Sequence, residues 1–258
     1  MTLHPRAISE IQQEYKKTQS IRAVHRQLGH SLSTIHKYVR QKFPNTTPQQ
    51  RITAVKTKSE LLTGIYVGLW MGDGTQYTDN GAYTTKICSS KTNIELNQFV
   101  QKLIKTLFGK KTHTNVHPKK NDLYIRMYSK FIYNYIYAFV AVQESKTHTV
   151  QLKQHISNYS EKFLRGVLLG LTLSDGYVKK TLVFRSTSHQ LALNFASILE
   201  KYGFTPTIRK KVRKQPNWND ITTVRLGIYD TKNIISLLNK TILETGISKM
   251  SVQQLKYA

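Results

Sequence analysis

Two apolar segments with regularly spaced small residues dominate this sequence. The first, GIYVGLWMGDG, spans residues 64–74 and contains Asp73, and the second, GVLLGLTLSDG, spans residues 166–176 and contains Asp175. In both, a glycine or serine occupies every fourth position up to the residue before the aspartate. Such spacing forms a stripe along a helix and lets two backbones approach closely. Because glycine destabilises a helix interior by roughly 0.5–1 kcal/mol relative to alanine, the stripe predicts a close contact between the two helices.

The sequence around the two segments is also repeated. Asp73 and Asp175 are 102 residues apart, and similar patterns follow each of them in the same order. These patterns are a strand-like stretch (81–90 and 180–188), an amphipathic helix (93–109 and 189–204), a basic hairpin (112–129 and 207–230) and a second helix (130–140 and 231–243). We therefore predict an α+β fold of two pseudo-symmetric αββαββα halves, residues 59–145 and 146–258, which meet at the small-residue helices.

The first 42 residues predict a small all-α domain of three short helices. The second helix ends at Gly29, and the third is short, capped by serine and basic. This order is typical of a helix-turn-helix DNA-binding domain, and the alternative is a three-helix bundle without a ligand. The positions expected to face outward and reach a groove are Ser33, Thr34, Lys37 and Tyr38. Residues 43–58 contain two prolines and no acidic residue, which predicts a basic linker.

The charge of the chain predicts a polyanionic partner. Lysine and arginine total 39 against 14 acidic residues, a formal net charge of +25 over 258 residues. Residues 1–58 contribute +9 of this charge (11 basic minus 2 acidic), so the excess is not confined to a tail. No segment is long enough to span a bilayer, and the N-terminus has no apolar signal core. With Cys88 as the single cysteine, we expect an intracellular protein, located in the cytoplasm or wherever its DNA resides and not secreted.

The position of the two aspartates favours a bound divalent cation. A carboxylate at a helix C-terminus meets the negative end of the helix dipole, and two neighbouring carboxylates repel each other. A divalent metal relieves both effects, and Mg²⁺ prefers carboxylate, carbonyl and water oxygens. Aspartates with a metal beneath basic strands predict a site that hydrolyses phosphodiesters. The alternative is that each Asp-Gly pair is only a turn after a core helix.

The segments YVGLWMGDG (66–74) and LLGLTLSDG (168–176) resemble the two motifs of a single-chain LAGLIDADG homing endonuclease. The resemblance covers roughly residues 59–250 and leaves the N-terminal helices outside it. It implies two four-stranded sheets that form a saddle over the DNA major groove, and motif aspartates that cut both strands across the minor groove. It also implies metal ligands, which would be Asp73, Asp175 and the backbone carbonyls of Gly72 and Ser174. The metal would be Mg²⁺, for which Mn²⁺ can substitute.

The resemblance further implies a basic residue, often lysine, that orients water or stabilises charge in the transition state. In the first half, Lys91 in the segment SSKTN occupies that place. The corresponding segment of the second half, RSTSH, has no lysine, so Arg185 becomes the candidate, with Lys179 and Lys180 as alternatives. This difference between the halves predicts that one DNA strand is cut faster than the other.

Alternation along the strands predicts which basic residues face DNA. The alternative for any single one of them is a solvated surface charge. The candidates are Lys86, Arg126, Arg185, Arg209, Lys211, Arg213 and Arg225. The aromatic residues of the run YIRMYSKFIYNYIYAF are expected to pack in the core.

Together these observations predict a monomeric, metal-dependent homing endonuclease that cuts double-stranded DNA at a specific site. We expect no membrane partner and no small-molecule cofactor. Two alternatives use the same fold: an RNA-splicing maturase and a non-catalytic transcription regulator. The presence of both motif aspartates favours the enzyme over the regulator.

Overall fold

The structure is a computed structural model that describes residues 3–18, 21–42, 59–79, 81–143, 145–212 and 219–257. The chain forms two compact units, Met1–Thr53 and Ala54–Ala258. The predicted linker, residues 43–58, lies outside the described residues.

The described part of the N-terminal unit, residues 3–18 and 21–42, contains three helices, as predicted: α1 (Pro5–Thr18), α2 (Ile21–Leu28) and α3 (Leu32–Lys42). Gly29 ends α2 with a backbone φ of 70°, which favours glycine. The buried core of this unit contains Ile11, Val24, Ile35, Tyr38 and Val39. The prediction that Tyr38 faces outward is therefore wrong. Its side chain is 4% exposed, and its hydroxyl accepts a hydrogen bond from the backbone N–H of Leu3 at 3.1 Å.

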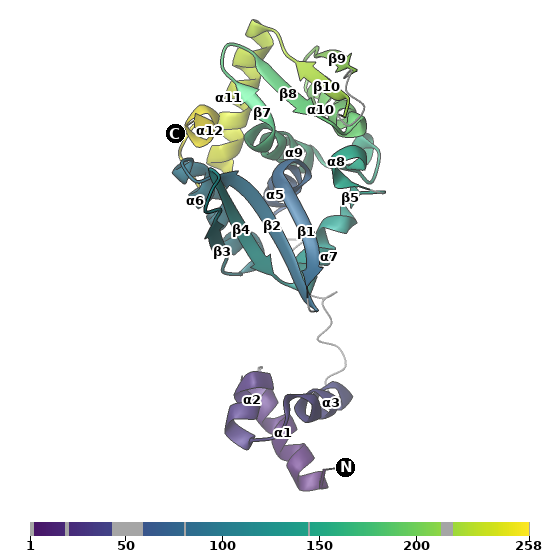
Figure 1. The fold of residues 1–258 in the computed structure, drawn as a ribbon, viewed down its shortest axis with the longest axis vertical. Helices are drawn as coiled ribbons and strands as arrows, with labels where there is room; N and C mark the ends of the chain where they lie inside the picture. The colour runs from purple at the N-terminus through teal and green to yellow at the C-terminus, as the bar shows by residue number, and fades with distance from the viewer. Residues whose placement is uncertain are drawn as a thin grey trace. The chain divides into compact units, whose positions relative to one another are not determined.

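The larger unit is built on two central helices, α5 (Glu60–Asp73) and α9 (Glu161–Ser174), which lie side by side in Figure 1. Ser59 caps the first turn of α5 and Ser160 that of α9. Each helix leads into a four-stranded antiparallel sheet, so the chain contains two similar halves as the repeat predicted.

In the first half the sheet order is β1-β2-β4-β3. Its strands and helices are β1 (Gly74–Asp79), β2 (Ala82–Ser90), α6 (Ile94–Phe108), β3 (His113–Val116), β4 (Asp122–Tyr128) and α7 (Lys130–Tyr135), followed by the short 3-10 helix η1 (Ile136–Ala138). The predicted helix at 130–140 is thus shorter than expected. Tyr135 and Phe139 are buried, which confirms that these two aromatic residues of the run belong to the core, whereas Tyr128 and Tyr137 are exposed, against the prediction.

In the second half the order β7-β8-β10-β9 repeats the first topology. Its elements are β7 (Gly176–Val178), β8 (Leu182–Ser186), α10 (His189–Lys201), β9 (Thr207–Lys211), β10 (Ile221–Arg225) and α11 (Ile228–Glu244). In this half α10 packs against β8 and β10, with Phe195 stacked on Phe184 at 4.3 Å between ring centroids.

Short elements that the sequence did not predict follow the second predicted helix of each half. Between the halves lie β5 (Val140–Ala141), α8 (Lys146–Thr149), β6 (Gln151–Leu152) and the 3-10 helix η2 (Ile156–Asn158). At the end of the second half lies α12 (Val252–Tyr257). Among all these described helices, none has the length and apolar character needed to cross a membrane.

The small-residue stripes hold α5 and α9 together. A Cβ added to Gly68 would lie 2.4 Å from the backbone oxygen of Val167, and one added to Gly170 would lie 2.3 Å from that of Ile65. These atoms belong to the backbone and cannot rotate away. The glycines are therefore required by contact between two helix backbones rather than by a turn.

We predict that Gly68→Ala lowers the free energy of unfolding by about 3 kcal/mol or more, because the two backbones must separate. Gly227→Ala is the matched control, since a Cβ there meets no atom within 4 Å. Its expected effect is within about 1 kcal/mol. Urea denaturation measures both values, and equal losses for the two variants would contradict the packing role.

Candidate active site

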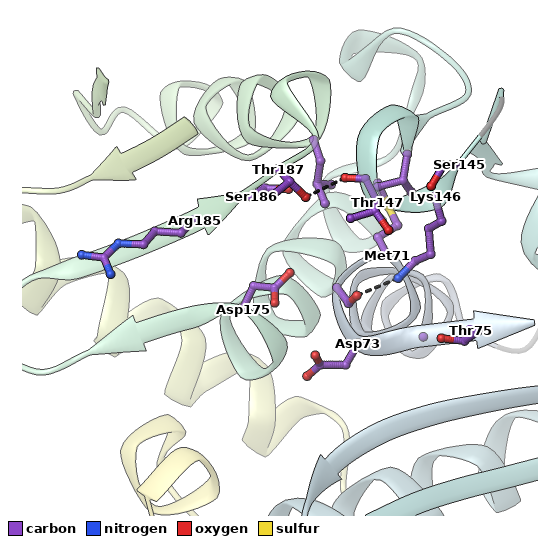
Figure 2. A pocket seen from close by; sticks show the side chains of 14 residues that line it. Met71, Asp73, Thr75, Ser145, Lys146, Thr147, Asp175, Arg185, Ser186 and Thr187 are labelled. Atoms are coloured by element: carbon purple, nitrogen blue, oxygen red, sulfur yellow. Dashed lines mark hydrogen bonds between the residues drawn. The ribbon is translucent and has the colours of Figure 1, made fainter. Parts of the chain in front are cut away.

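The C-terminal ends of α5 and α9 open into a cavity of 520 Å³. Asp73, the last residue of α5, and Asp175, the C-cap of α9, both line it. Figure 2 shows the two carboxylates on neighbouring helix ends at one side of the cavity. The structure therefore brings together the two aspartates that the sequence singled out.

The residues before the aspartates explain how the two ends come so close. A Cβ on Gly72 would lie 2.1 Å from Ser174 Oγ and 3.1 Å from an oxygen of the Asp175 carboxylate. The stripe thus ends with glycine facing serine. Ser174 Oγ donates back to the carbonyl of Gly170 at 3.1 Å, within its own helix.

Two lysines that the sequence analysis missed bind these helix ends. Lys146, the first residue of α8, donates from Nζ to the carbonyl of Gly72 at 2.6 Å, and its ammonium lies 5.2 Å from the centroid of the Trp70 ring. Lys256 in α12 donates from Nζ to the carbonyl of Leu173 at 2.7 Å and also to that of Ser174. Each motif helix therefore ends against one lysine.

Burial and charge shift the pKa values of all four groups. Burial and the neighbouring charge of Asp73 raise the pKa of Asp175 to about 6, while Lys146 and Lys256 oppose the rise. Burial likewise raises the pKa of Asp73 against the same two lysines. Burial lowers the pKa of Lys146 to about 8 and lowers that of Lys256, and the two aspartates oppose both shifts. In the absence of other cations the lysines are the counter-ions of this site.

The donor set fits a hard divalent cation. It contains two carboxylates whose ionised forms burial disfavours, and the carbonyls of Gly72 and Ser174 beside them. Such oxygens suit Mg²⁺ or Mn²⁺. Over the described ranges, no group of three or more His, Cys, Asp or Glu residues is placed to bind a metal. A cation here would thus rely on carbonyls, water or a phosphate for its remaining ligands.

Of the basic residues predicted for catalysis, Lys91 lies away from the cavity and Arg185 lies on its rim. Lys91 lies in the exposed turn between β2 and α6 and does not line the cavity. Arg185 on β8 lines the rim, but its side chain extends away from Asp175 (Figure 2). Lys179 and Lys180 are exposed after β7. The lysines that contact the motif helices are Lys146 and Lys256, in short segments where no periodicity or motif marked them.

The face of the first sheet opposite its buried side carries the predicted basic residues. Lys86 on β2 pairs with Arg126 on β4, and the same row continues to Thr75 on β1 and His113 on β3. The ammonium of Lys86 lies 4.7 Å from the centroid of the Tyr124 ring. This cation–π contact holds the lysine within the row.

The second sheet has more positive charge on the matching face. Phe184 and Val224 are buried beneath the sheet, so the alternate positions face the other way. Arg185 on β8 and Arg209 on β9 both pair with Thr223 on β10, so they lie in one row across the sheet. Arg225 and Lys211 occupy further positions on the same face. All four of these basic residues are exposed. Arg213 lies outside the described residues.

In the N-terminal unit, Ser33 and Lys37 are exposed on α3, as predicted. Thr34 is half-buried, and its hydroxyl bonds to that of Ser31 at 2.7 Å. Ser33 and Lys37 therefore form the accessible part of the predicted set.

Comparisons with known proteins agree with the fold. Residues 162–241 match the family model described as a LAGLIDADG-like domain. Mesophilic variants of the homing endonuclease I-DmoI have a similar structure, with a TM-score of 0.54 and 15% identity over 70% of this chain and 90% of that chain. I-DmoI in complex with DNA and Ca gives a TM-score of 0.55 and 14% identity over 72% of this chain and 98% of that one. A third structure, I-DmoI in complex with DNA and Mn, gives a TM-score of 0.54 and 15% identity over 69% of this chain and 96% of that one.

None of the curated proteins matches this chain by sequence. The family match covers only the second half of the repeat, and at these identities the structural likeness concerns the fold. The predicted α+β fold with two similar halves is therefore confirmed.

We predict that Asp175→Asn stabilises the metal-free protein. The pKa of Asp175 is raised from 3.8 to about 6, so the folded state holds this proton more tightly than the unfolded state. Stability from this group is therefore lost as pH rises from about 4 to about 6. At pH 7 in a chelator, Asp175→Asn should raise the free energy of unfolding by about 1–3 kcal/mol, and the gain should vanish near pH 4.

The control for this measurement is Asp79→Asn, an exposed aspartate at the end of β1. It should change stability by less than about 0.5 kcal/mol at either pH. A loss of stability in Asp175→Asn at pH 7 would contradict this prediction. It would show that the lysines fully offset the cost of burying the ionised Asp175 carboxylate.

Proposed function

We propose that this chain is a metal-dependent endonuclease that cuts both strands of DNA at a specific site. The observation that carries the proposal is the meeting of Asp73 and Asp175, from two related helices, in one cavity with a lysine at each motif. One carboxylate from each half matches the need to cut two strands that run in opposite directions.

In this proposal a divalent cation, Mg²⁺ or Mn²⁺, would be held by the two carboxylates and by the carbonyls of Gly72 and Ser174. Each of these carbonyls accepts from a lysine through one lone pair, so its second lone pair would be the one offered to the metal. When bound, it would activate a water molecule and stabilise charge on the phosphate. The similar fold of I-DmoI has been solved with DNA together with Mn or Ca, which supports a divalent metal. The contact between the two helices would fix the positions of both aspartates and so orient their carboxylates as metal ligands.

Lys146 and Lys256 take the role that the sequence analysis gave to Lys91 and Arg185. Both are partly buried and hydrogen-bonded at the helix ends, so their ammonium groups lie where a scissile phosphate would add negative charge. The expectation of unequal cutting rates depended on a lysine in one half alone. Because each motif has its own lysine, this reason no longer applies.

DNA would lie along the uncovered faces of the two sheets. Lys86 and Arg126 would contact it from the first sheet, and Arg185, Arg209, Lys211 and Arg225 from the second. Arg213 belongs to the same predicted set. The greater charge of the second sheet supports tighter phosphate or guanine contacts in that half of the target. We further propose a monomer within the cell, since one chain supplies both halves.

The N-terminal unit would add a second DNA contact as a helix-turn-helix domain. Ser33 and Lys37 on the exposed side of α3 are the residues placed to reach a groove, with Thr34 beside them. The buried Tyr38 is no longer part of this set.

Cleavage of a randomised double-stranded DNA library in Mg²⁺ tests the enzyme directly. We expect discrete staggered cuts that disappear in Asp73→Asn and in Asp175→Asn, because removing either carboxylate removes a metal ligand. The same variants should still bind the cut site. Binding without any cut by the unaltered chain, in Mg²⁺ or Mn²⁺, would contradict the proposal and favour the regulator. Tight binding of structured RNA alone would favour the maturase.

The salt dependence of binding tests the helix-turn-helix proposal. In the full chain made inactive by Asp73→Asn, Lys37→Ala should weaken DNA binding and reduce the slope of log affinity against log salt by about 1, the loss of one phosphate contact. Lys16→Ala removes the same charge from α1 and should leave the slope unchanged. Equal slopes for both variants would mean that α3 does not contact DNA.

A further inference from the structure

The short helices that carry Lys146 and Lys256 pack against opposite halves. Lys146 follows the last helices of the first half, and α8 contacts α10 of the second. Lys256 follows the last helix of the second half, and α12 contacts α6 of the first. Lys146, from the segment that connects the halves, nevertheless reaches the motif helix of the first half, and Lys256 reaches that of the second. The two arrangements are related by the same pseudo-symmetry as the sheets.

On the first-half side, the contact is made by the residue that caps α6. Asn93 accepts a hydrogen bond from the backbone N–H of Leu96 at 3.2 Å through its side-chain oxygen. Its amide nitrogen donates to the backbone carbonyl of Lys256 at 3.1 Å. Asn93 is only 9% exposed. One side chain thus caps a helix of the first half and holds the active-site lysine of the second.

On the second-half side, the cap of α10 makes the equivalent contact. The hydroxyl of Ser188 accepts from the N–H of Leu191 at 3.3 Å and donates to the carbonyl of Val150 at 2.8 Å, just after α8. Its neighbour Thr187 donates from its hydroxyl to the carbonyl of Thr147 at 2.7 Å, as the dashed line in Figure 2 marks. This carbonyl belongs to the residue that follows Lys146.

Capping alone does not require an asparagine at position 93. An N-cap needs a side-chain oxygen that accepts from the first turn, and aspartate or serine supplies it equally well. Asparagine differs from these residues by its amide N–H donor, and this amide donates to the backbone carbonyl of Lys256. Because α12 has only six residues, it is far too short to be stable by itself. A lysine side chain is also flexible, so fixing its backbone narrows the positions that its ammonium can reach.

We propose that Asn93, Ser188 and Thr187 are positioning residues that act through the two lysines. Each half of the protein holds the lysine that serves the motif of the other half, so neither half forms a complete site alone. Asn93 fixes Lys256 at the end of α9, whereas Ser188 and Thr187 fix Lys146 at the end of α5. This inference rests on the proposed endonuclease function, because it assigns the residues a role in cutting particular strands.

The test compares Asn93→Ser and Asn93→Asp with the unaltered chain. Both variants keep an acceptor for the cap and lose the amide donor. Single-turnover cleavage with each strand labelled separately should show one strand cut about tenfold more slowly or worse, because misplacing a catalytic group strongly slows chemistry. The other strand should be cut at the original rate. Thr187→Val, which removes only the hydroxyl, should slow the opposite strand.

Two controls separate positioning from general loss of structure. Ser129→Ala removes the cap of α7, which contacts neither lysine, and should leave the ratio of the two strand rates unchanged. In a Lys256→Met background, Asn93→Ser should cause no further slowing, since it acts through that lysine. Equal slowing of both strands, or an undiminished effect in the Lys256→Met background, would overturn the proposal.

Hydrogen exchange provides a measurement that does not depend on cleavage. The amides of residues 250–257 should exchange faster in Asn93→Ser and at the original rate in Ser129→Ala. Unchanged exchange in Asn93→Ser would overturn the anchoring of α12 whatever the chain cuts. If the unaltered chain cuts no DNA while exchange responds as expected, the endonuclease proposal and the strand-specific role fail, and the anchoring of Lys256 stands.

Discussion

The direct contact between the backbones of α5 and α9 is the constraint on which the rest of the larger unit depends. Gly64, Gly68, Gly166 and Gly170 remove every side chain that would hold the helices apart. Because the helices run together to their C-terminal ends, Asp73 and Asp175 enter the same cavity. The same approach places two carboxylates against the unfavourable ends of two helix dipoles.

The protein compensates this unfavourable arrangement with charge brought from outside the motif helices. Lys146 and Lys256 come from short segments that depend on tertiary packing: α8 contacts α10, and α12 contacts α6, α11 and α9. Their hydrogen bonds to the helix-end carbonyls place positive charge beside the carboxylates, yet burial still raises the pKa of both aspartates. The ionised carboxylates are therefore disfavoured in the metal-free protein, and the divalent cation that we propose would relieve this cost.

The sequence predicted the parts of the structure that local patterns determine. The glycine spacing identified α5 and α9, and the repeat of strand and helix patterns identified both sheets and placed Arg185, Arg209 and Arg225 on one face. These features follow from periodicity, which a single sequence displays.

The errors have physical causes of their own. Ile35, Tyr38 and Val39 follow the spacing of a buried helix face, and this signal in the sequence argues against the predicted outward position of Tyr38. Lys146 and Lys256 could not be found in this way, because their positions depend on tertiary contacts of very short helices. Lys91 was chosen by resemblance, and the turn that carries it faces solvent instead.

A shared metal site is tested most directly by locating Mn²⁺ by anomalous scattering in crystals of the full chain, with and without Asp175→Asn. We expect a peak between the carboxylates of Asp73 and Asp175 that is lost or strongly reduced in the variant. A protein that binds no Mn²⁺ there, or that binds it equally well without the Asp175 carboxylate, would contradict the claim that the two helices are packed together to build one shared metal site.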